Sequence, residues 1–165
     1  MIHSVASKLR VLLVDDQPLI RLAVEFMLGE TAEITDAADG AAGVEAFRRR
    51  RFDVVLMDMD MPVMDGLTAV RELRRLEAVR NSGRTPIIMF TSNDLPKHRA
   101  ASAQAGADLH LGKPTSAELL FGAIHAALSG QTVLDGDRGA AREHAPTTDS
   151  AAITSVGPGD RRPMD

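Results

Sequence analysis

A short apolar run that leads directly into acids and a turn constrains this sequence more than any other feature. Val54–Met57 contains no polar residue, Asp58 follows it at once, and Pro62 with Asp65-Gly66 ends the extended segment. A strand without polar alternation is typical of a parallel sheet that helices cover on both faces. Ligands of such sheets bind beyond the carboxyl ends of the strands, so the pattern predicts a functional acid at Asp58.

The same succession of apolar run, polar residue and helical segment occurs five times along the chain. We expect strands at residues 10–14, 33–37, 54–57, 87–90 and 109–111. Helices are expected at 19–28, from about 40 to 51, from 67 to about 79, at 96–105 and at 116–128. Strands that alternate with helices predict a parallel sheet with right-handed crossovers, whose strand carboxyl ends share one edge. The fold class is therefore expected to be α/β.

Apolar residues at helical spacing mark the expected helices. In the second helix, Val44 and Phe47 form the expected inner face and Gly43 lies at a close contact. In the third helix, Arg71, Glu72, Arg74 and Arg75 are expected to face water. The apolar positions of the first, third and last helices are Leu19, Leu22, Ala23, Phe26 and Met27; Leu67, Val70, Leu73, Leu76 and Val79; and Ala117, Leu120, Phe121, Ile124 and Leu128.

A run of four arginines, Arg48 to Arg51, closes the second helix. Cations near the carboxyl end of a helix interact favourably with its dipole, by about 0.3 to 1 kcal/mol. We interpret the run as a solvated helix end rather than as a basic docking patch.

Length and composition limit the remaining possibilities. The 165 residues suit one domain with an appendage, and a net charge of -4 with 3% aromatic residues argues against nucleic-acid binding. The chain has no cysteine and no apolar run near the roughly 18 residues that a membrane span needs. We expect a cytoplasmic protein without a membrane segment, built from a short extension at residues 1–8, a domain at 9–129 and a disordered tail at 130–165.

Five polar side chains are expected to meet at the shared sheet edge: Asp15, Asp16, Asp58, Thr91 and Lys113. Three acids placed together repel one another, so they raise a pKa or recruit a cation, and ligands that are all oxygen favour Mg²⁺. Lys113 and Thr91 offer an ammonium and a hydroxyl to a tetrahedral oxyanion, which indicates a phosphoryl site. Asp58 is then placed to attack phosphorus and form an acyl phosphate.

These residues lie within motifs that resemble a known family. The motifs are Val11-Leu12-Leu13-Val14-Asp15-Asp16-Gln17-Pro18, Asp58-Met59-Asp60-Met61-Pro62 with Met64-Asp65-Gly66, Pro86-Ile87-Ile88 leading to Thr91, and Ala107-Asp108 through Gly112-Lys113-Pro114. Over residues 9 to 128 the sequence resembles the receiver (CheY-like) domain of two-component response regulators, including single-domain regulators and the receivers of hybrid histidine kinases. The resemblance implies a flavodoxin-like, doubly wound (βα)5 fold with strand order 2-1-3-4-5.

The resemblance also implies the roles of the acids. Asp58 would accept a phosphoryl group from a histidine kinase or a histidine phosphotransfer protein. Asp15 and Asp16 would hold Mg²⁺ together with Asp58, and the backbone carbonyl of Asp60 would complete the protein ligands. The product would be a phosphoprotein that signals, with at most slow self-dephosphorylation, rather than an enzyme.

Three further positions follow from the same resemblance. Lys113 and Thr91 would contact the phosphoryl group, and the peptide bond between Lys113 and Pro114 would be cis. The family usually has Tyr or Phe on the fifth strand where this chain has His110. With His110 there, we expect the conformational relay from Thr91 to be weaker or to depend on pH.

Output is expected through contact with a downstream protein or through onward phosphoryl transfer, because residues 130–165 are too short and too polar for a DNA-binding domain. The chain would act as a monomer or as a phosphorylation-dependent dimer. The alternative is a phosphatase of the haloacid-dehalogenase type, using Asp58 and Asp60 as an Asp-x-Asp pair. That family carries its Asp-x-Asp on the first strand, which argues against it. A degenerate receiver serving only as an interaction module is disfavoured because every site residue is present.

Overall fold

The computed structural model describes residues 7–130, which form a single parallel sheet between two layers of helices. The strand order is β2-β1-β3-β4-β5, and every neighbouring pair is parallel. The expected fold class and strand order are confirmed. The strands are β1 (Leu9–Val14), β2 (Ala32–Ala37), β3 (Val54–Met57), β4 (Ile87–Thr91) and β5 (Leu109–Gly112).

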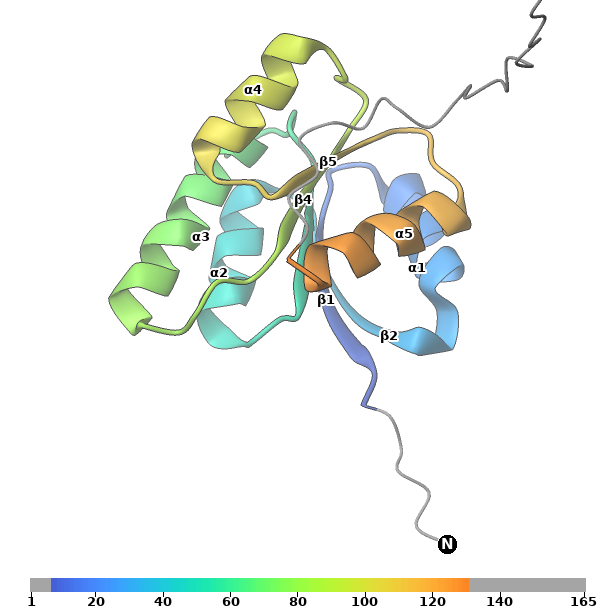
Figure 1. Ribbon diagram of the computed structural model, residues 1–165, viewed down its shortest axis with the longest axis horizontal. Coiled ribbons are helices and arrows are strands. Elements are labelled where there is room, and N and C mark those ends of the chain that lie inside the picture. The colour runs from blue at the N-terminus through green and yellow to red at the C-terminus, as the bar shows by residue number, and fades with distance from the viewer. Residues whose placement is uncertain (1–6, 131–165) are drawn as a thin grey trace, which may run out of the picture.

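The helices cover both faces of the sheet. Helices α2, α3 and α4 lie on one face, and α1 and α5 lie on the other (Figure 1). A short 3-10 helix, η1 (Gly29–Thr31), follows α1. The helices are α1 (Pro18–Leu28), α2 (Gly40–Arg49), α3 (Gly66–Arg80), α4 (Pro96–Ala105) and α5 (Ala117–Leu128).

Three of these helices begin at a side-chain cap that the sequence supplies. Asp39 accepts a hydrogen bond from the Ala42 amide at 2.8 Å, and Asp65 accepts one from the Thr68 amide at 2.9 Å. Ser116 does the same at the start of α5. Each cap satisfies an amide that the first helical turn leaves without a partner, so the βα loops end where these polar residues stand.

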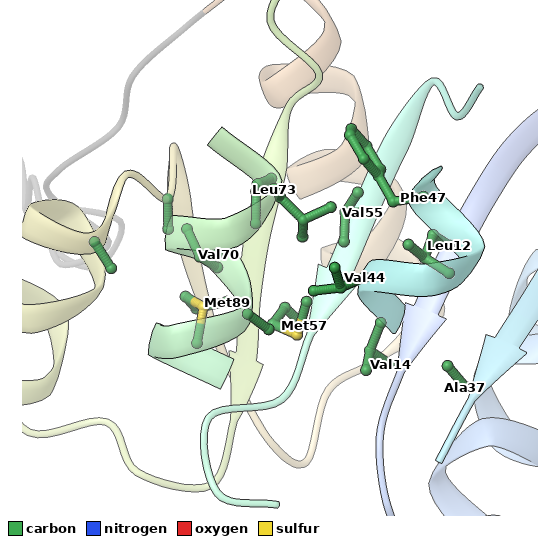
Figure 2. Packing of buried hydrophobic residues seen from close by; sticks show 14 of the residues in the cluster. Leu12, Val14, Ala37, Val44, Phe47, Val55, Met57, Val70, Leu73 and Met89 are labelled. Atoms are coloured by element: carbon green, nitrogen blue, oxygen red, sulfur yellow. The ribbon is translucent and has the colours of Figure 1, made fainter. Parts of the chain in front are cut away.

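The central strands lack polar alternation because helices bury both of their faces. Leu12 and Val14 pack beneath α2 and α3, together with Val55, Met57 and Met89 (Figure 2). The residues that alternate with them form a second cluster on the opposite face. Its main members are Val11, Leu13, Val54, Leu56, Ile88 and Phe90, which pack against Val24 and Leu28 of α1 and Leu120 and Ile124 of α5.

Helix α2 packs closely on the sheet at Gly43. A Cβ at Gly43 would lie 2.7 Å from Cγ2 of Val14. Val44 and Phe47 of the same helix are buried, so the expected inner face and the expected close contact are both confirmed.

Helix α1 buries a different face from the one that its apolar spacing suggests. Val24 and Leu28 are buried, whereas Leu19, Leu22 and Phe26 are 79%, 61% and 87% exposed. The helix is apolar nearly all round, so the spacing alone allows more than one stripe. Packing against β1 and α5 selects the stripe that contains Val24 and Leu28, and the expected stripe lies largely on the surface.

Two positions of α3 also differ from the sequence prediction. Val79 is 85% exposed, so it does not belong to the buried face of α3. Arg74, expected in water, has a side chain only 14% exposed, and it pairs with Glu77 and Asp108 at 2.8 Å each. Arg74 also donates to the carbonyl of Gly106 at 2.9 Å. The guanidinium therefore ties α3 to the loop that precedes β5.

The inner face of α5 is shorter than expected. Leu120, Ile124 and Ala127 are buried, but Phe121 and Leu128 are 40% and 46% exposed. The last two side chains flank the buried stripe, at the rim of the helix. Among residues 7–130, no helix combines the length and the apolar character that crossing a membrane requires. Most of the expected extension and nearly all of the expected tail lie outside the described residues.

Candidate functional site

Two buried acids meet at the carboxyl edge of the sheet. Asp15 follows β1 and Asp58 follows β3, and they are 0% and 4% exposed. Backbone hydrogen bonds continue past the strand ends and fix both residues: the Asp15 amide donates to Ala37 at 3.0 Å, and the Asp58 amide donates to Val14 at 2.8 Å. With Asp16, these residues place one carboxylate oxygen each within 4.8 Å of the others. The three predicted acids therefore form one cluster.

Lys113 brings a cation from the loop after β5 to this cluster. Its Nζ contacts the Asp15 carboxylate directly and lies 3.3 Å from Oδ1 of Asp58. The Lys113 side chain is 4% exposed, and its ammonium lies 5.1 Å from the centroid of the Phe90 ring. Burying one charge alone would be costly, so the ammonium and the carboxylates depend on one another. The peptide bond from Lys113 to Pro114 is cis, as the resemblance implied.

Burial raises the pKa of the Asp58 carboxyl above its usual range, and this is the largest effect on the group. The nearby Lys113 ammonium opposes the rise in pKa, the negative charge of Asp15 adds to it, and the Met59 amide, which donates to Oδ1 at 2.9 Å, opposes it. The environment therefore holds a carboxylate that is poorly solvated and faces a single cation. An electrophile that carries negative charge would be repelled by such a carboxylate. The two can react only when the site supplies more positive charge than Lys113 alone provides.

The acid cluster has the ligand set that Mg²⁺ requires. All three members offer carboxylate oxygens, and no histidine or cysteine within residues 7–130 joins them. Oδ1 of Asp16 is buried and has no hydrogen-bond partner in this part of the chain. A buried oxygen without a partner costs free energy, and a hard divalent cation would satisfy it. The residues therefore fit Mg²⁺, with Asp15, Asp16 and Asp58 as its side-chain ligands.

Thr91 ends β4 at the same edge of the sheet. It is 1% exposed, and its Oγ1 accepts a hydrogen bond from the Asn93 amide at 3.2 Å. The Asn93 side chain in turn contacts the carboxylate of Asp60, which is exposed. The β4–α4 loop is thus joined to the loop after β3 across the mouth of the site. The five side chains that we expected at this edge all lie there, namely Asp15, Asp16, Asp58, Thr91 and Lys113.

The comparison with protein families agrees with this geometry. Residues 11–125 match the model of the response regulator receiver domain. The chain belongs to this family. The haloacid-dehalogenase alternative is not supported, because the whole βα succession, with its acid pair after β1, matches the receiver instead.

Curated relatives place the receiver within larger proteins. The sensor protein GacS of Pseudomonas syringae pv. syringae is 36% identical over 151 residues, which is 90% of this chain and 16% of that protein. The probable transcriptional regulatory protein TcrX of Mycobacterium tuberculosis is 37% identical over 131 residues, which is 79% of this chain and 54% of that protein. The receiver thus spans only part of the length of these relatives.

Solved structures show the same fold. The receiver domain of the sensor histidine kinase PA1611 from Pseudomonas aeruginosa superposes with a TM-score of 0.67 at 35% identity, over 74% of this chain and 99% of that one. That structure contains a magnesium ion coordinated in the active site cleft. The chemotaxis protein CheY4 of Vibrio cholerae gives a TM-score of 0.66 at 31% identity, over 73% of this chain and 99% of that one.

His110 of the receiver lies beside the β4–α4 loop rather than among the acids. Its Nε2 is 3.3 Å from Oδ1 of Asp94, without hydrogen-bond geometry, and its Nδ1 is 3.5 Å from Oγ of Ser102. Asp94 forms a two-pronged pair with Arg99 at 2.7 Å for each bond. Burial, the largest effect, lowers the pKa of His110, and it outweighs the opposing charge of Asp94. The imidazole is therefore biased toward its neutral form.

Sequence reasoning did not find several residues that support the receiver site. Asp94 and Ser102 were not singled out as neighbours of His110, and Asn93 was not expected to reach Asp60. Each contact joins residues that lie on different elements, so the spacing of residues along the sequence does not predict it. One signal was available for Asp94: an acid and a base five positions apart, Asp94 and Arg99, flank the start of α4.

Proposed function

We propose that Asp58 of this receiver accepts a phosphoryl group from a phosphohistidine of a histidine kinase or a histidine phosphotransfer protein. The observation that carries the proposal is that the buried carboxylate of Asp58 lies beside the acid pair Asp15 and Asp16 and beside the buried ammonium of Lys113. Asp15 and Asp16 lie on one side of it, and Lys113 approaches it to 3.3 Å. An acid in such a setting has a role beyond helix capping.

The reaction follows from what each side chain can do. An oxygen of the Asp58 carboxylate attacks phosphorus, the bond from phosphorus to the donor imidazole breaks, and its electron pair stays on the imidazole nitrogen. The product is an acyl phosphate on Asp58. The Lys113 ammonium is placed to exchange its contact with a carboxylate for one with a phosphoryl oxygen. The Thr91 hydroxyl, turned toward the Asn93 amide, is free to donate to another phosphoryl oxygen when the loop moves.

Mg²⁺, held by Asp15, Asp16 and Asp58, would neutralise the charge that a phosphoryl group adds beside three acids. The backbone carbonyl of Asp60 as a further ligand stays a prediction. The residues of the chain then orient the acceptor oxygen, exclude bulk water from the buried carboxylate and supply the ammonium. Nothing in this scheme needs a general base, because Asp58 reacts as a carboxylate.

We infer that the phosphorylated receiver signals by contact with a protein or passes the phosphoryl group on. The loop that joins Thr91 to Asp94 and, through it, to His110 connects the acceptor site to the surface around α4 and β5. We place the working domain at residues 9–129 and assign it no enzymatic turnover beyond slow self-dephosphorylation. The cytoplasmic location and the monomeric or phosphorylation-dependent dimeric state stay predictions.

One pair of variants tests the proposal against the phosphatase alternative. Asp58→Asn is expected to abolish labelling by acetyl phosphate in Mg²⁺, because an amide cannot form the acyl phosphate. Asp60→Asn is expected to label still and to change only the lifetime of the label. Circular dichroism of both variants confirms that they fold. The proposal is wrong if the wild-type chain turns over phosphate esters many times and Asp60→Asn stops that release.

A further inference from the structure

A second charged site lies at the opposite edge of the sheet from Asp58. There α2 ends at Arg49, α3 ends at Arg80 and β3 begins at Val54. The two carboxyl helix ends and the intervening segment surround an open hollow of about 400 Å³. Its lining consists of five arginines: Arg48, Arg49, Arg50, Arg51 and Arg80.

Three of these arginines form ion pairs, but only two carboxylates serve all three. Glu45 pairs with Arg49 at 2.8 Å and with Arg48 at 3.7 Å, and Glu33 pairs with Arg50 at 2.7 Å. The side chains of Arg48, Arg49 and Arg50 are 58%, 75% and 53% exposed, so their guanidinium groups remain accessible to a solute.

The other two arginines interact with backbone carbonyls. Arg51 donates to the carbonyl of Ser82 at 3.1 Å, and Arg80 donates to the carbonyl of Phe47 at 3.1 Å and contacts that of Arg48. Within residues 7–130, neither of them forms an ion pair with a carboxylate. Five positive charges therefore meet two negative ones, an excess of three in a chain whose net charge is -4.

The exposure of these side chains agrees with the solvated helix end that we expected, but a solvated helix end does not by itself require five arginines around one hollow. One or two cations suffice to complement the partial negative charge at a helix carboxyl end, and the effect fades within the last turn. Here five arginines line a single hollow instead of being spread over the surface. Like charges gathered around one hollow repel one another, and a multiply charged anion bound there would offset that repulsion.

We propose that this arginine hollow binds a small anionic group that carries two or more phosphoryl groups. Guanidinium groups match phosphate oxygens with two parallel hydrogen bonds, which an ammonium cannot do. A volume of about 400 Å³ falls within the range of about 300 to 1,000 Å³ that small-molecule sites occupy. The site is separate from the acceptor acids and does not depend on the function proposed for them.

A nucleic acid fits these observations less well than a small polyphosphate. Binding along a nucleic-acid backbone needs a basic track, and this chain is acidic overall, with positive charge gathered at one compact hollow. Aromatic residues for base stacking are scarce, at 3% of the sequence. The hollow therefore suits an anion that its five arginines can surround.

The test is a titration of the full-length chain with inorganic tripolyphosphate, without Mg²⁺, followed by backbone and arginine side-chain NMR signals. We expect saturable shifts centred on residues 48–51 and Arg80, and we expect Arg48→Gln with Arg51→Gln to weaken binding by about tenfold or more. Arg80 is left intact because it holds the carbonyls that end α2. The matched control, Arg71→Gln with Arg75→Gln on the exposed side of α3, removes the same charge and should leave affinity unchanged.

Four outcomes would overturn the proposal: no saturable binding, shifts centred on Lys113, equal weakening in both double variants, or tighter binding of a duplex or single-stranded oligonucleotide through the same arginines. Vesicles that contain phosphatidylinositol bisphosphate form a second arm. If the chain sediments with them only when Arg48 and Arg51 are present, the phosphoryl chemistry is supported and its source is a lipid headgroup. If it stays in solution while tripolyphosphate binds, the soluble source is supported.

Discussion

Replacing Gly66 by alanine should destabilise the receiver and displace Asp58, the proposed phosphoacceptor. Gly66 is the first residue of α3, and its amide donates to the carbonyl of Met59 at 2.8 Å. A Cβ at Gly66 would lie 1.9 Å from the carbonyl oxygen of Asp58 and 2.9 Å from its carbonyl carbon. Both are backbone atoms, so no side chain can rotate away, and the loop after β3 or the start of α3 has to move.

The size of the effect follows from that distance. Reaching an ordinary contact of 3.4 Å requires a displacement of about 1.5 Å of backbone that is held at both ends. Overpacking costs about 1 to 3 kcal/mol, and we expect the upper end for backbone atoms. Alanine gains back about 1 kcal/mol of helix propensity, which leaves a net loss of about 2 kcal/mol. A shift of Asp58 by more than 1 Å should also slow its phosphorylation by about 100-fold.

Urea unfolding followed by circular dichroism measures the stability change, because the chain has no tryptophan or tyrosine to report fluorescence. The midpoint for Gly66→Ala should fall by about 1 M. The matched control is Gly122→Ala in α5, where a Cβ would meet no atom within 4 Å. That variant should gain about 0.5 to 1 kcal/mol and phosphorylate normally. If Gly66→Ala proves as stable and as reactive as Gly122→Ala, the contact with Asp58 is not as described.

Two further changes test interactions that lie away from the acids. Arg74→Met should cost about 3 kcal/mol, since it leaves the buried Glu77 carboxylate without its cation, while Arg75→Met on the exposed side should cost less than about 0.5 kcal/mol; equal midpoints in urea would refute the buried network. His110→Phe should remove a pH dependence of folding stability. Burial lowers the pKa of His110 in the folded state, so the neutral imidazole's contribution to stability is complete above the unfolded pKa of about 6.5. That contribution is lost as pH falls below about 6.5, because the unfolded chain then binds the proton more readily. Parallel urea midpoints for wild type and His110→Phe between about pH 7.5 and 5.5 would contradict this assignment.

The sheet and the convergence of the acids with Lys113 could be predicted because the sequence encodes them locally. A strand that is buried on both faces must be apolar throughout, and a parallel sheet must place the residues after its strands at one edge. Asp15 and Asp58 each follow such a run directly, and Lys113 follows the short fifth strand. Parallel topology then brings them together without further information, and the contacts of Lys113 with both acids confirm that convergence.

The burial of α1 could not be predicted, because its sequence carries more than one apolar stripe. Leu19, Leu22 and Phe26 are as apolar as Val24 and Leu28, and only the position of the helix against β1 and α5 decides between them. Periodicity identifies a helix and its possible faces. It identifies the buried face only when the other face is polar.

The role of Arg74 could not be predicted for a different reason. Its carboxylate partner Asp108 lies 34 positions away, in the loop before β5, and no local pattern links the two. The neighbours of His110 pose the same problem, since Asp94 reaches it from the β4–α4 loop. Long-range polar contacts depend on how closely a loop approaches a helix or a strand, which the order of strands and helices does not specify.

The most direct test of the central claim is to locate the covalent phosphoryl group. The wild-type chain is phosphorylated with acetyl phosphate in Mg²⁺, the acyl phosphate is reduced with borohydride, and the digested peptides are read by mass spectrometry. Reduction converts a phosphorylated aspartate to homoserine, so the proposal predicts homoserine at position 58, dependent on Mg²⁺ and absent from Asp58→Asn. Homoserine at Asp15, Asp16 or Asp60 instead, or no reduced residue in a folded and metal-loaded chain, would contradict the assignment of Asp58 as the phosphoacceptor.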